Sequence, residues 1–213
     1  MKIPDIQLQP DRCALIIIDM QNDFVSAEGH SDRHGKDFQK AQPGIDAIQL
    51  LCRQLPEDLK RIFIQTIREP DGSDYHWRFH KIMPERIRSS YHRDPGDLNC
   101  LRGTWGADIV EPLKPGPSDH IFFKRRYSAF YQSDLEMCLR SWGIDTLIFT
   151  GVVAEICVET TVRDAFVRDF DIIVVTDGVI SWNENACRSF LQVVSNSLGM
   201  TASAAGVLDV FRG

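Results

Sequence analysis

The stretch CALIIID, residues 13–19, decides how the rest of the chain is interpreted. Six apolar residues in a row are typical of a strand that is buried on both faces. Such strands occur in parallel sheets that helices cover on both sides. The run ends at Asp19, so a carboxylate lies at the carboxyl end of the predicted strand.

Further apolar runs alternate with amphipathic segments along the chain. We predict strands at residues 61–67, 120–123, 146–153, 172–176 and 201–204, and helices at residues 45–55, 135–142, 157–170 and 185–198. Strands that alternate with helices indicate parallel pairing. We therefore expect one α/β domain over residues 1–213, a doubly wound, Rossmann-like, mostly parallel six-stranded sheet with helices on both faces.

Composition narrows the function classes. The chain has 213 residues, 43% of them apolar and 25% charged, with a net charge of −6 and no basic stripe that would bind nucleic acid. Its six cysteines form no C-x-x-C motif, and no segment is long and apolar enough for a signal peptide or a membrane span. We expect a cytoplasmic protein with reduced thiols and with neither a nucleic-acid nor a membrane partner.

Three reactive residues follow predicted strands. Asp19 follows the first strand, Lys124 the third and Cys157 the fourth. The carboxyl ends of parallel strands lie at one edge of a sheet, where such folds bind ligands. We therefore expect these three side chains to converge.

Each of the three residues also has an ordinary structural interpretation. Cys157 at a helix N-terminus beside a lysine would have a lowered thiol pKa, although most single cysteines are small buried apolar residues. Asp19 could accept the thiol proton, but carboxylates more often cap turns, a role for which Asp23 is the better candidate. Lys124 would pair with Asp19, or would extend along the surface toward water.

Three motifs carry a family resemblance. The segments ALIIIDMQNDF (14–24), FFKRRYSAF (122–130) and TGVVAEICVETTVRDAF (150–166) resemble those of the isochorismatase-like cysteine hydrolases, and the match extends over about residues 14–182. This superfamily includes nicotinamidase, biuret hydrolase, ureidoacrylate hydrolase and N-carbamoylsarcosine amidohydrolase. The resemblance implies a catalytic triad of Asp19, Lys124 and Cys157.

The same resemblance implies details of the reaction. It implies a cis peptide between Val152 and Val153, and an oxyanion hole formed by the backbone N–H groups of Val153 and Cys157. The cysteine would attack an amide carbonyl, release ammonia or an amine, and leave an acyl-enzyme for water to hydrolyse. Isochorismatases proper, which cleave a vinyl ether, lack this cysteine, so its presence favours acyl transfer.

Departures from the family pattern bear on the substrate. The metal-binding Asp-x-His motif of nicotinamidases is missing after the second predicted strand, and we interpret His76 and His80 as loop or interface residues. We expect no metal and no cofactor. Position 154 is Ala where many relatives have Thr, which removes a hydroxyl beside the oxyanion turn.

Aromatic residues complete the expected site. Tyr127 and Trp105 lie in segments that look most like the biuret and ureidoacrylate hydrolases, and Phe24 matches an aromatic pocket position. Ordinary aromatic packing explains these three residues equally well.

We thus expect an amidohydrolase that acts on a small amide, carbamoyl or ureide compound and forms a homo-oligomer, either a dimer or a tetramer. Three alternatives remain open: a nicotinamidase-like hydrolase, a catalytically silent binding member of the fold, and a redox role for Cys157.

Overall fold

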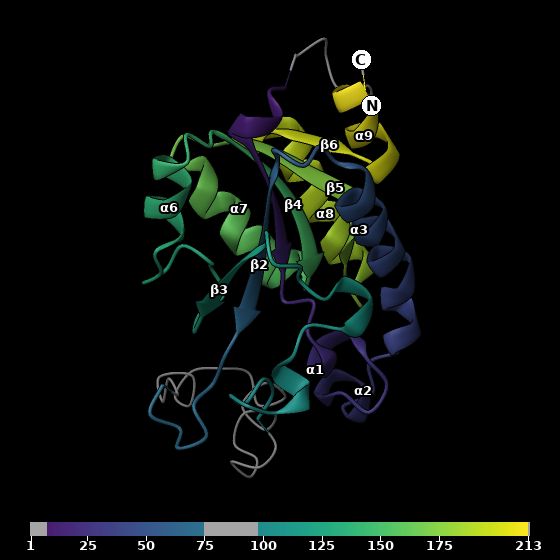
Figure 1. Ribbon diagram of the computed structural model, residues 1–213. Coiled ribbons are helices and arrows are strands. Elements are labelled where there is room, and N and C mark those ends of the chain that lie inside the picture. The colour runs from purple at the N-terminus through teal and green to yellow at the C-terminus, as the bar shows by residue number, and fades with distance from the viewer. Residues whose placement is uncertain (1–7, 75–97, 213) are drawn as a thin grey trace.

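A six-stranded sheet forms the centre of the protein (Figure 1). The computed structural model describes residues 8–74 and 98–212. The strands follow the order β3-β2-β1-β4-β5-β6, and all five neighbouring pairs are parallel. Their bounds are Cys13–Ile18 (β1), Lys60–Thr66 (β2), His120–Lys124 (β3), Thr146–Val152 (β4), Asp171–Ile180 (β5) and Met200–Ala202 (β6).

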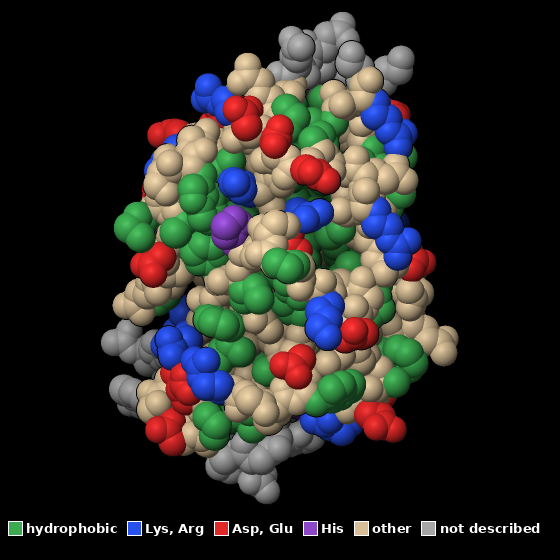
Figure 2. All heavy atoms as spheres, in the orientation of Figure 1, with side chains coloured by type: hydrophobic (Ala, Val, Ile, Leu, Met, Phe, Trp, Pro, Cys, Tyr) green, Lys and Arg blue, Asp and Glu red, His purple; other side chains and the backbone are tan. Residues whose placement is uncertain are grey.

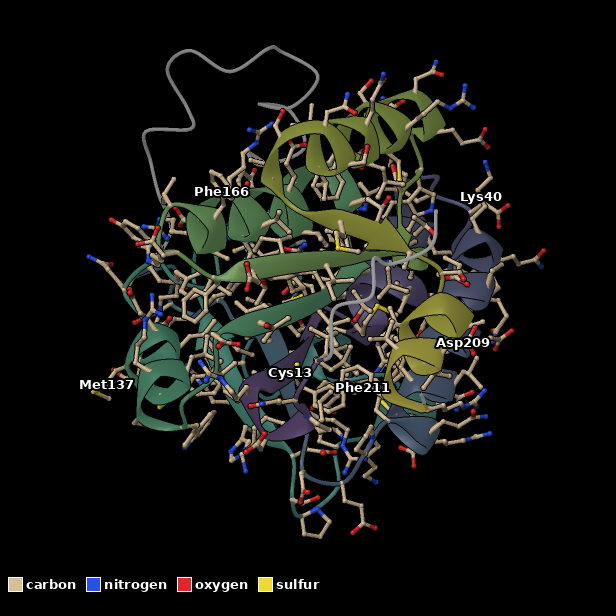
Figure 3. All side chains as sticks on the ribbon, turned by 90° about the horizontal axis from the view of Figure 1, so that it is seen from above. Cys13, Lys40, Met137, Phe166, Asp209 and Phe211 are labelled. Atoms are coloured by element: carbon tan, nitrogen blue, oxygen red, sulfur yellow. The ribbon has the colours of Figure 1, made fainter. Side chains whose placement is uncertain are left out.

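Helices cover both faces of this sheet (Figure 3). On one face lie α3 (Gln42–Gln54) and α9 (Ala204–Arg212); on the other lie α6 (Leu135–Ser141), α7 (Glu159–Phe166) and α8 (Glu184–Val193). Alternate residues of β1 belong to the two opposite cores, Leu15 and Ile17 to the first and Ile16 and Ile18 to the second. The predicted doubly wound α/β fold, with its first strand buried on both faces, is confirmed.

Shorter helical segments connect these elements. They are α1 (Asn22–Val25), α2 (His30–Arg33), the 3-10 turns η1 (Pro10–Arg12), η2 (Phe38–Ala41), η4 (Trp105–Ala107) and η5 (Glu111–Leu113), and the π-helical turns η6 (Ala154–Val158) and η7 (Val194–Leu198). Several of them lie beyond the carboxyl ends of β1 and β2, next to the expected site (Figure 1).

Some predicted bounds were wrong. The strand predicted at residues 172–176 is twice as long, because β5 continues past an irregularity in its pairing with β4 as far as Ile180. The helix predicted at residues 157–170 ends at Phe166 and is preceded by the π-helical turn η6, which contains Cys157. The C-terminal helix α9 was not predicted.

The register of the strands brings the expected residues to one edge. Ile18 at the end of β1 pairs with Ile64 of β2 and with Gly151 of β4, and Thr66 pairs with Lys124 at the ends of β2 and β3. Asp19 and the turn that holds Cys157 follow directly from β1 and β4.

The surface carries charges of both signs. On the face shown in Figure 2, lysine and arginine side chains are interspersed with aspartate and glutamate. Among the helices of residues 8–74 and 98–212, none combines the length and apolar character that crossing a membrane requires.

Candidate active site

The backbone at Asp19 turns sharply where β1 ends. Asp19 has φ of 54°, in the left-handed region that non-glycine residues seldom adopt, and its N–H donates to the carbonyl of Ile64 at 2.9 Å. Beside it, Gly151 has φ of 116°, and a Cβ at this position would lie 2.1 Å from the Ile18 carbonyl oxygen. Glycine thus allows β4 to approach β1 closely at the point where Asp19 turns its side chain into the site.

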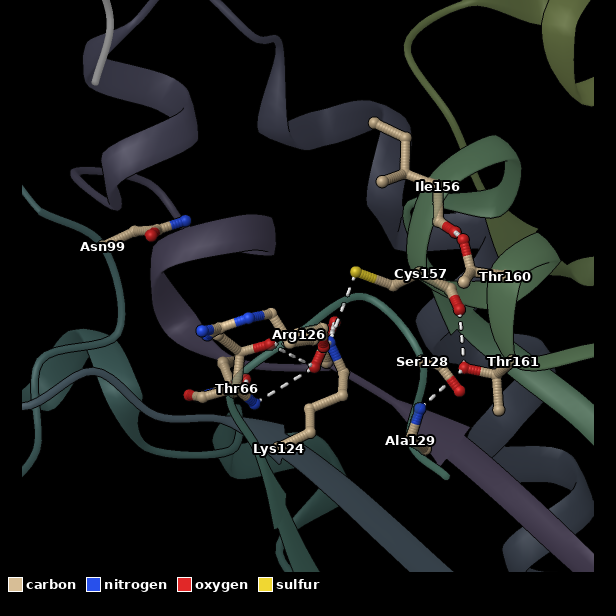
Figure 4. A network of polar contacts seen from close by, with 12 residues as sticks. Thr66, Asn99, Lys124, Arg126, Ser128, Ala129, Ile156, Cys157, Thr160 and Thr161 are labelled. Atoms are coloured by element: carbon tan, nitrogen blue, oxygen red, sulfur yellow. Dashed lines mark hydrogen bonds and ion pairs between the residues drawn. The ribbon is translucent and has the colours of Figure 1, made fainter. Parts of the chain in front are cut away.

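Lys124 lies between the carboxylate and the thiol. Its Nζ is 2.8 Å from Oδ2 of Asp19 and 3.3 Å from Sγ of Cys157. It also donates to the hydroxyl of Thr66 at 2.8 Å and to the carbonyl of Arg126 at 3.2 Å (Figure 4). The three residues that the sequence placed at separate strand ends are therefore in mutual reach.

The turn that carries Cys157 is fixed by hydroxyl groups of α7. Thr160 donates to the carbonyl of Ile156 at 2.6 Å, and Thr161 donates to the carbonyl of Cys157 at 2.7 Å. The Thr161 hydroxyl in turn accepts the N–H of Ala129, which ties this turn to the loop after β3 (Figure 4). These bonds hold the sulfur in a defined position.

Exposure differs among the three side chains. Asp19 is 0% exposed and Lys124 is 2% exposed, whereas Cys157 keeps 8% of its surface accessible. Cys157 is thus the most exposed of the three residues, and the charged pair is more deeply buried.

The expected effect on the thiol was wrong in direction. The pKa of Cys157 is raised to about 12, mainly because burial disfavours the thiolate; Lys124 lowers it, but Asp19 raises it. For Lys124, burial disfavours the ammonium, yet the attraction of Asp19 and Cys157 outweighs burial and the pKa is raised. The resting group is therefore a neutral thiol beside an ammonium ion, and a thiolate forms only when the proton moves elsewhere.

The expected oxyanion turn has a distinctive backbone. The Val152–Val153 peptide is cis. The carbonyl of Val153 accepts the N–H groups of both Ile156 and Val158. This carbonyl therefore points into the π-helical turn.

The three expected aromatic contacts have different surroundings. Phe24 packs against the small apolar cluster of Ile67, Cys100 and Ala107 and against the main core. This agrees with its interpretation as an ordinary aromatic packing residue. Trp105, in η4, and Tyr127, after β3, are both exposed. Both are thus more exposed than Phe24, which is partly buried.

Sequence reasoning missed Thr66 and Gln21, and assigned Asp23 correctly. The hydroxyl and N–H of Thr66 both bond to Asp19, and the buried amide of Gln21 bonds to the N–H and carbonyl of Thr66. Thr66 ends β2 at the same edge as the other residues, but the predicted strand ran one residue further, to residue 67, and a threonine in this position is no distinctive signal. Asp23 accepts the N–H of His30 at the start of α2 and the N–H of Cys100, a capping role.

Two further features of the described residues bear on ligand binding: their His, Cys, Asp and Glu side chains and a separate hollow. In residues 8–74 and 98–212, no cluster of three His, Cys, Asp or Glu side chains has the arrangement of a metal site; His76 and His80 lie outside these residues. A hollow of about 470 Å³ lies apart from the three residues, between the start of α3, the end of β5 and α8. Its lining mixes Lys40 and Arg188 with Asp177 and Glu184, which favours no one class of ligand.

Comparison with known proteins shows the family to which the chain belongs. The isochorismatase domain model matches residues 13–205. A ureidoacrylate amidohydrolase RutB from Pantoea ananatis is 34% identical over 177 residues, covering 81% of this chain and 70% of that protein, and one from Methylorubrum extorquens is 33% identical over 178 residues, covering 81% and 71%. The crystal structure of a cysteine hydrolase from Pseudomonas syringae pv. phaseolicola superposes with a TM-score of 0.81 at 25% identity, covering 97% of this chain and 95% of that chain. The chain therefore belongs to the isochorismatase family of hydrolases.

Proposed function

We propose that this protein is a cysteine amidohydrolase that cleaves the C–N bond of a small carbamoyl or ureide compound through a thioester intermediate. The observation that carries the proposal is the buried contact of Lys124 Nζ with both Asp19 Oδ2, at 2.8 Å, and Cys157 Sγ, at 3.3 Å. This arrangement offers a nucleophile, a proton acceptor and a fixed positive charge in one place.

The first half-reaction forms the thioester. As substrate binds, the thiol proton moves to Asp19. The positive charge of Lys124 stabilises the thiolate that forms and, once the proton has left Asp19 again, the carboxylate. Sulfur attacks the carbonyl carbon, and the negative charge on oxygen is held by the backbone N–H groups of Val153 and Cys157. Asp19 then returns the proton to the nitrogen, the C–N bond breaks, and ammonia or an amine leaves.

The second half-reaction restores the enzyme. Asp19 takes a proton from water, the hydroxide attacks the thioester, and the C–S bond breaks. The sulfur regains its proton from Asp19. Because the pKa of Cys157 is about 12, the thiol is mainly neutral before substrate binds, and the carboxylate is needed at each cycle.

Ureidoacrylate is the first substrate to test, because relatives that are named for its hydrolysis match most of the chain. The test is an ammonia-release screen over ureidoacrylate, biuret, carbamoyl amino acids, nicotinamide and maleamate, with Cys157→Ala as the control. We expect release from at least one ureide and none from the variant. Absence of release from every compound, or equal release by the variant, would contradict the proposal. Release from nicotinamide alone would assign the nicotinamidase-like alternative.

A further inference from the structure

Thr66 makes the two oxygens of the Asp19 carboxylate unequal. Oδ1 accepts the N–H of Thr66 at 3.1 Å and the hydroxyl of Thr66 at 3.0 Å. Oδ2 forms the ion pair with Lys124 at 2.8 Å, and no hydroxyl or backbone N–H group of the described residues donates to it. Thr66 therefore anchors Oδ1, and Oδ2, which faces the ammonium group of Lys124, is the oxygen left to accept a proton.

The direction of the Thr66 hydroxyl follows from its neighbours. An ammonium group can only donate, and an ionised carboxylate can only accept. The hydroxyl lies 2.8 Å from Nζ of Lys124 and 3.0 Å from Oδ1 of Asp19, so it must accept from the first and donate to the second. Thr66 thus joins Lys124 to the far oxygen of Asp19 by a second route beside the direct ion pair.

Thr66 is itself held firmly. Its N–H also bonds to Oε1 of Gln21 at 2.8 Å, and its carbonyl accepts the Gln21 amide at 2.9 Å. Thr66 is 8% exposed and Gln21 is 0% exposed. A hydroxyl with two charged partners and a fixed backbone has one orientation, which suits it to orient another group.

We propose that Thr66 is a positioning residue that holds Oδ1 of Asp19 in place and so reserves Oδ2 for the proton of the Cys157 thiol. The inference rests on the proposed function for its kinetic consequence. Its geometric part concerns the resting thiol and carboxylate and can be tested without a substrate.

The test compares Thr66→Val, which keeps the branched shape and removes the hydroxyl, with Thr66→Ser, which keeps the hydroxyl. Thr146→Val is the matched control, because the buried Thr146 also donates its hydroxyl to a carboxylate, that of Asp145, at the opposite end of the sheet. If circular dichroism shows that Thr66→Val is misfolded, Thr66→Ala takes its place.

The first readout is the infrared S–H stretching band of Cys157, identified by its loss in Cys157→Ala. We expect Thr66→Val to shift this band to higher frequency, because the thiol loses a well-placed acceptor, and we expect Thr66→Ser and Thr146→Val to leave it unchanged. A band that stays in place in Thr66→Val overturns the inference whatever happens to activity.

The second readout is the kinetics on the best substrate of the screen. Loss of one hydrogen bond to a charged group predicts a fall in kcat of roughly 10- to 100-fold with little change in KM, since Thr66 acts through Asp19 and not on the substrate. An equal fall in Thr66→Ser or in Thr146→Val would overturn the positioning role. If the wild type cleaves no amide, the proposed function fails, and the S–H band still decides the role of Thr66.

Discussion

Two clusters in this protein each contain a thiol, a cation and a carboxylate, at opposite ends of the sheet. At the carboxyl ends of the strands are Cys157, Lys124 and Asp19. At the amino ends, Arg61 of β2 donates to Asp119 at 2.6 Å and to the carbonyl of Cys52 at 3.0 Å. Burial raises the pKa of both thiols, that of Cys157 to about 12 and that of Cys52 to about 11.

The two clusters differ in the hydrogen-bond partners of the carboxylate oxygens and in which cysteine atom the cation contacts. Asp119 uses Oδ1 for Arg61 and Oδ2 for the N–H of Gly116 at 2.7 Å, so both oxygens accept hydrogen bonds. Arg61 contacts the backbone of Cys52, whereas Lys124 contacts the sulfur of Cys157 itself. We infer that a thiol, a cation and a carboxylate in proximity do not by themselves make a site. The site also needs a carboxylate oxygen that no backbone group occupies and a cation that contacts the sulfur atom itself.

The largest contrast is expected from removing each thiol. Cys157→Ala should lower kcat/KM by at least ~10⁴-fold, because the residue that forms the intermediate is gone. Cys52→Ala should retain wild-type kinetics. Ammonia-release assays on both purified variants check this, and a large loss in Cys52→Ala would remove the distinction between the clusters.

Neutralising each carboxylate separately should distinguish an effect on the acylation rate from an effect on the free energy of unfolding. Asp19→Asn should lower the acylation rate by roughly 10²- to 10⁴-fold, because the amide cannot accept the thiol proton. Asp119→Asn should leave acylation intact and cost roughly 1 kcal/mol of unfolding free energy. Single-turnover trapping and urea denaturation measure the two quantities, and equal acylation rates in Asp19→Asn and the wild type would refute the assignment of Asp19.

Removing the buried cation should destabilise the fold. Lys124→Met leaves the carboxylate of Asp19 buried without a counter-charge, at a cost of roughly 3–5 kcal/mol in unfolding free energy. Adding Asp19→Asn to Lys124→Met should recover part of this loss. Denaturant titration of the two single variants and the double variant gives the coupling energy, and strict additivity would show that the pair is not coupled.

The smallest effect concerns how the reactivity of the two thiols depends on pH. Because the neutral thiol is favoured below a pKa of about 12 for Cys157 and about 11 for Cys52, each thiolate fraction should rise about tenfold per pH unit between roughly pH 8 and pH 10. Peptide mass spectrometry after short exposure to iodoacetamide measures both sites in one sample. A plateau for Cys157 below about pH 9 would contradict the raised pKa.

The sheet could be predicted from the sequence because each strand is marked by an apolar run within a single segment. The apolar runs of β1 and β4 and the reactive residues at strand ends sufficed to place Asp19, Lys124 and Cys157 at one edge. Other features depend on contacts between segments. The burial that raises the pKa of Cys157 comes from several elements packing together, whereas the sequence predicted only the charged neighbours Asp19 and Lys124.

Thr66 shows a second limit of sequence reasoning. A threonine at a strand end is common, and its importance arises from two charged partners supplied by β1 and β3. The π-helical turn at Cys157 was missed for a similar reason, since the apolar spacing of residues 157–166 does not distinguish it from an ordinary first turn of helix.

The most direct test is to identify where the acyl group is carried during turnover. Wild-type enzyme is mixed with the best ureide substrate, quenched in acid within its first turnovers, and digested for mass spectrometry. We expect an acyl adduct on the peptide that contains Cys157, and unmodified Cys52 in the same sample. Turnover with no adduct on Cys157, or with the adduct on another cysteine, would contradict it.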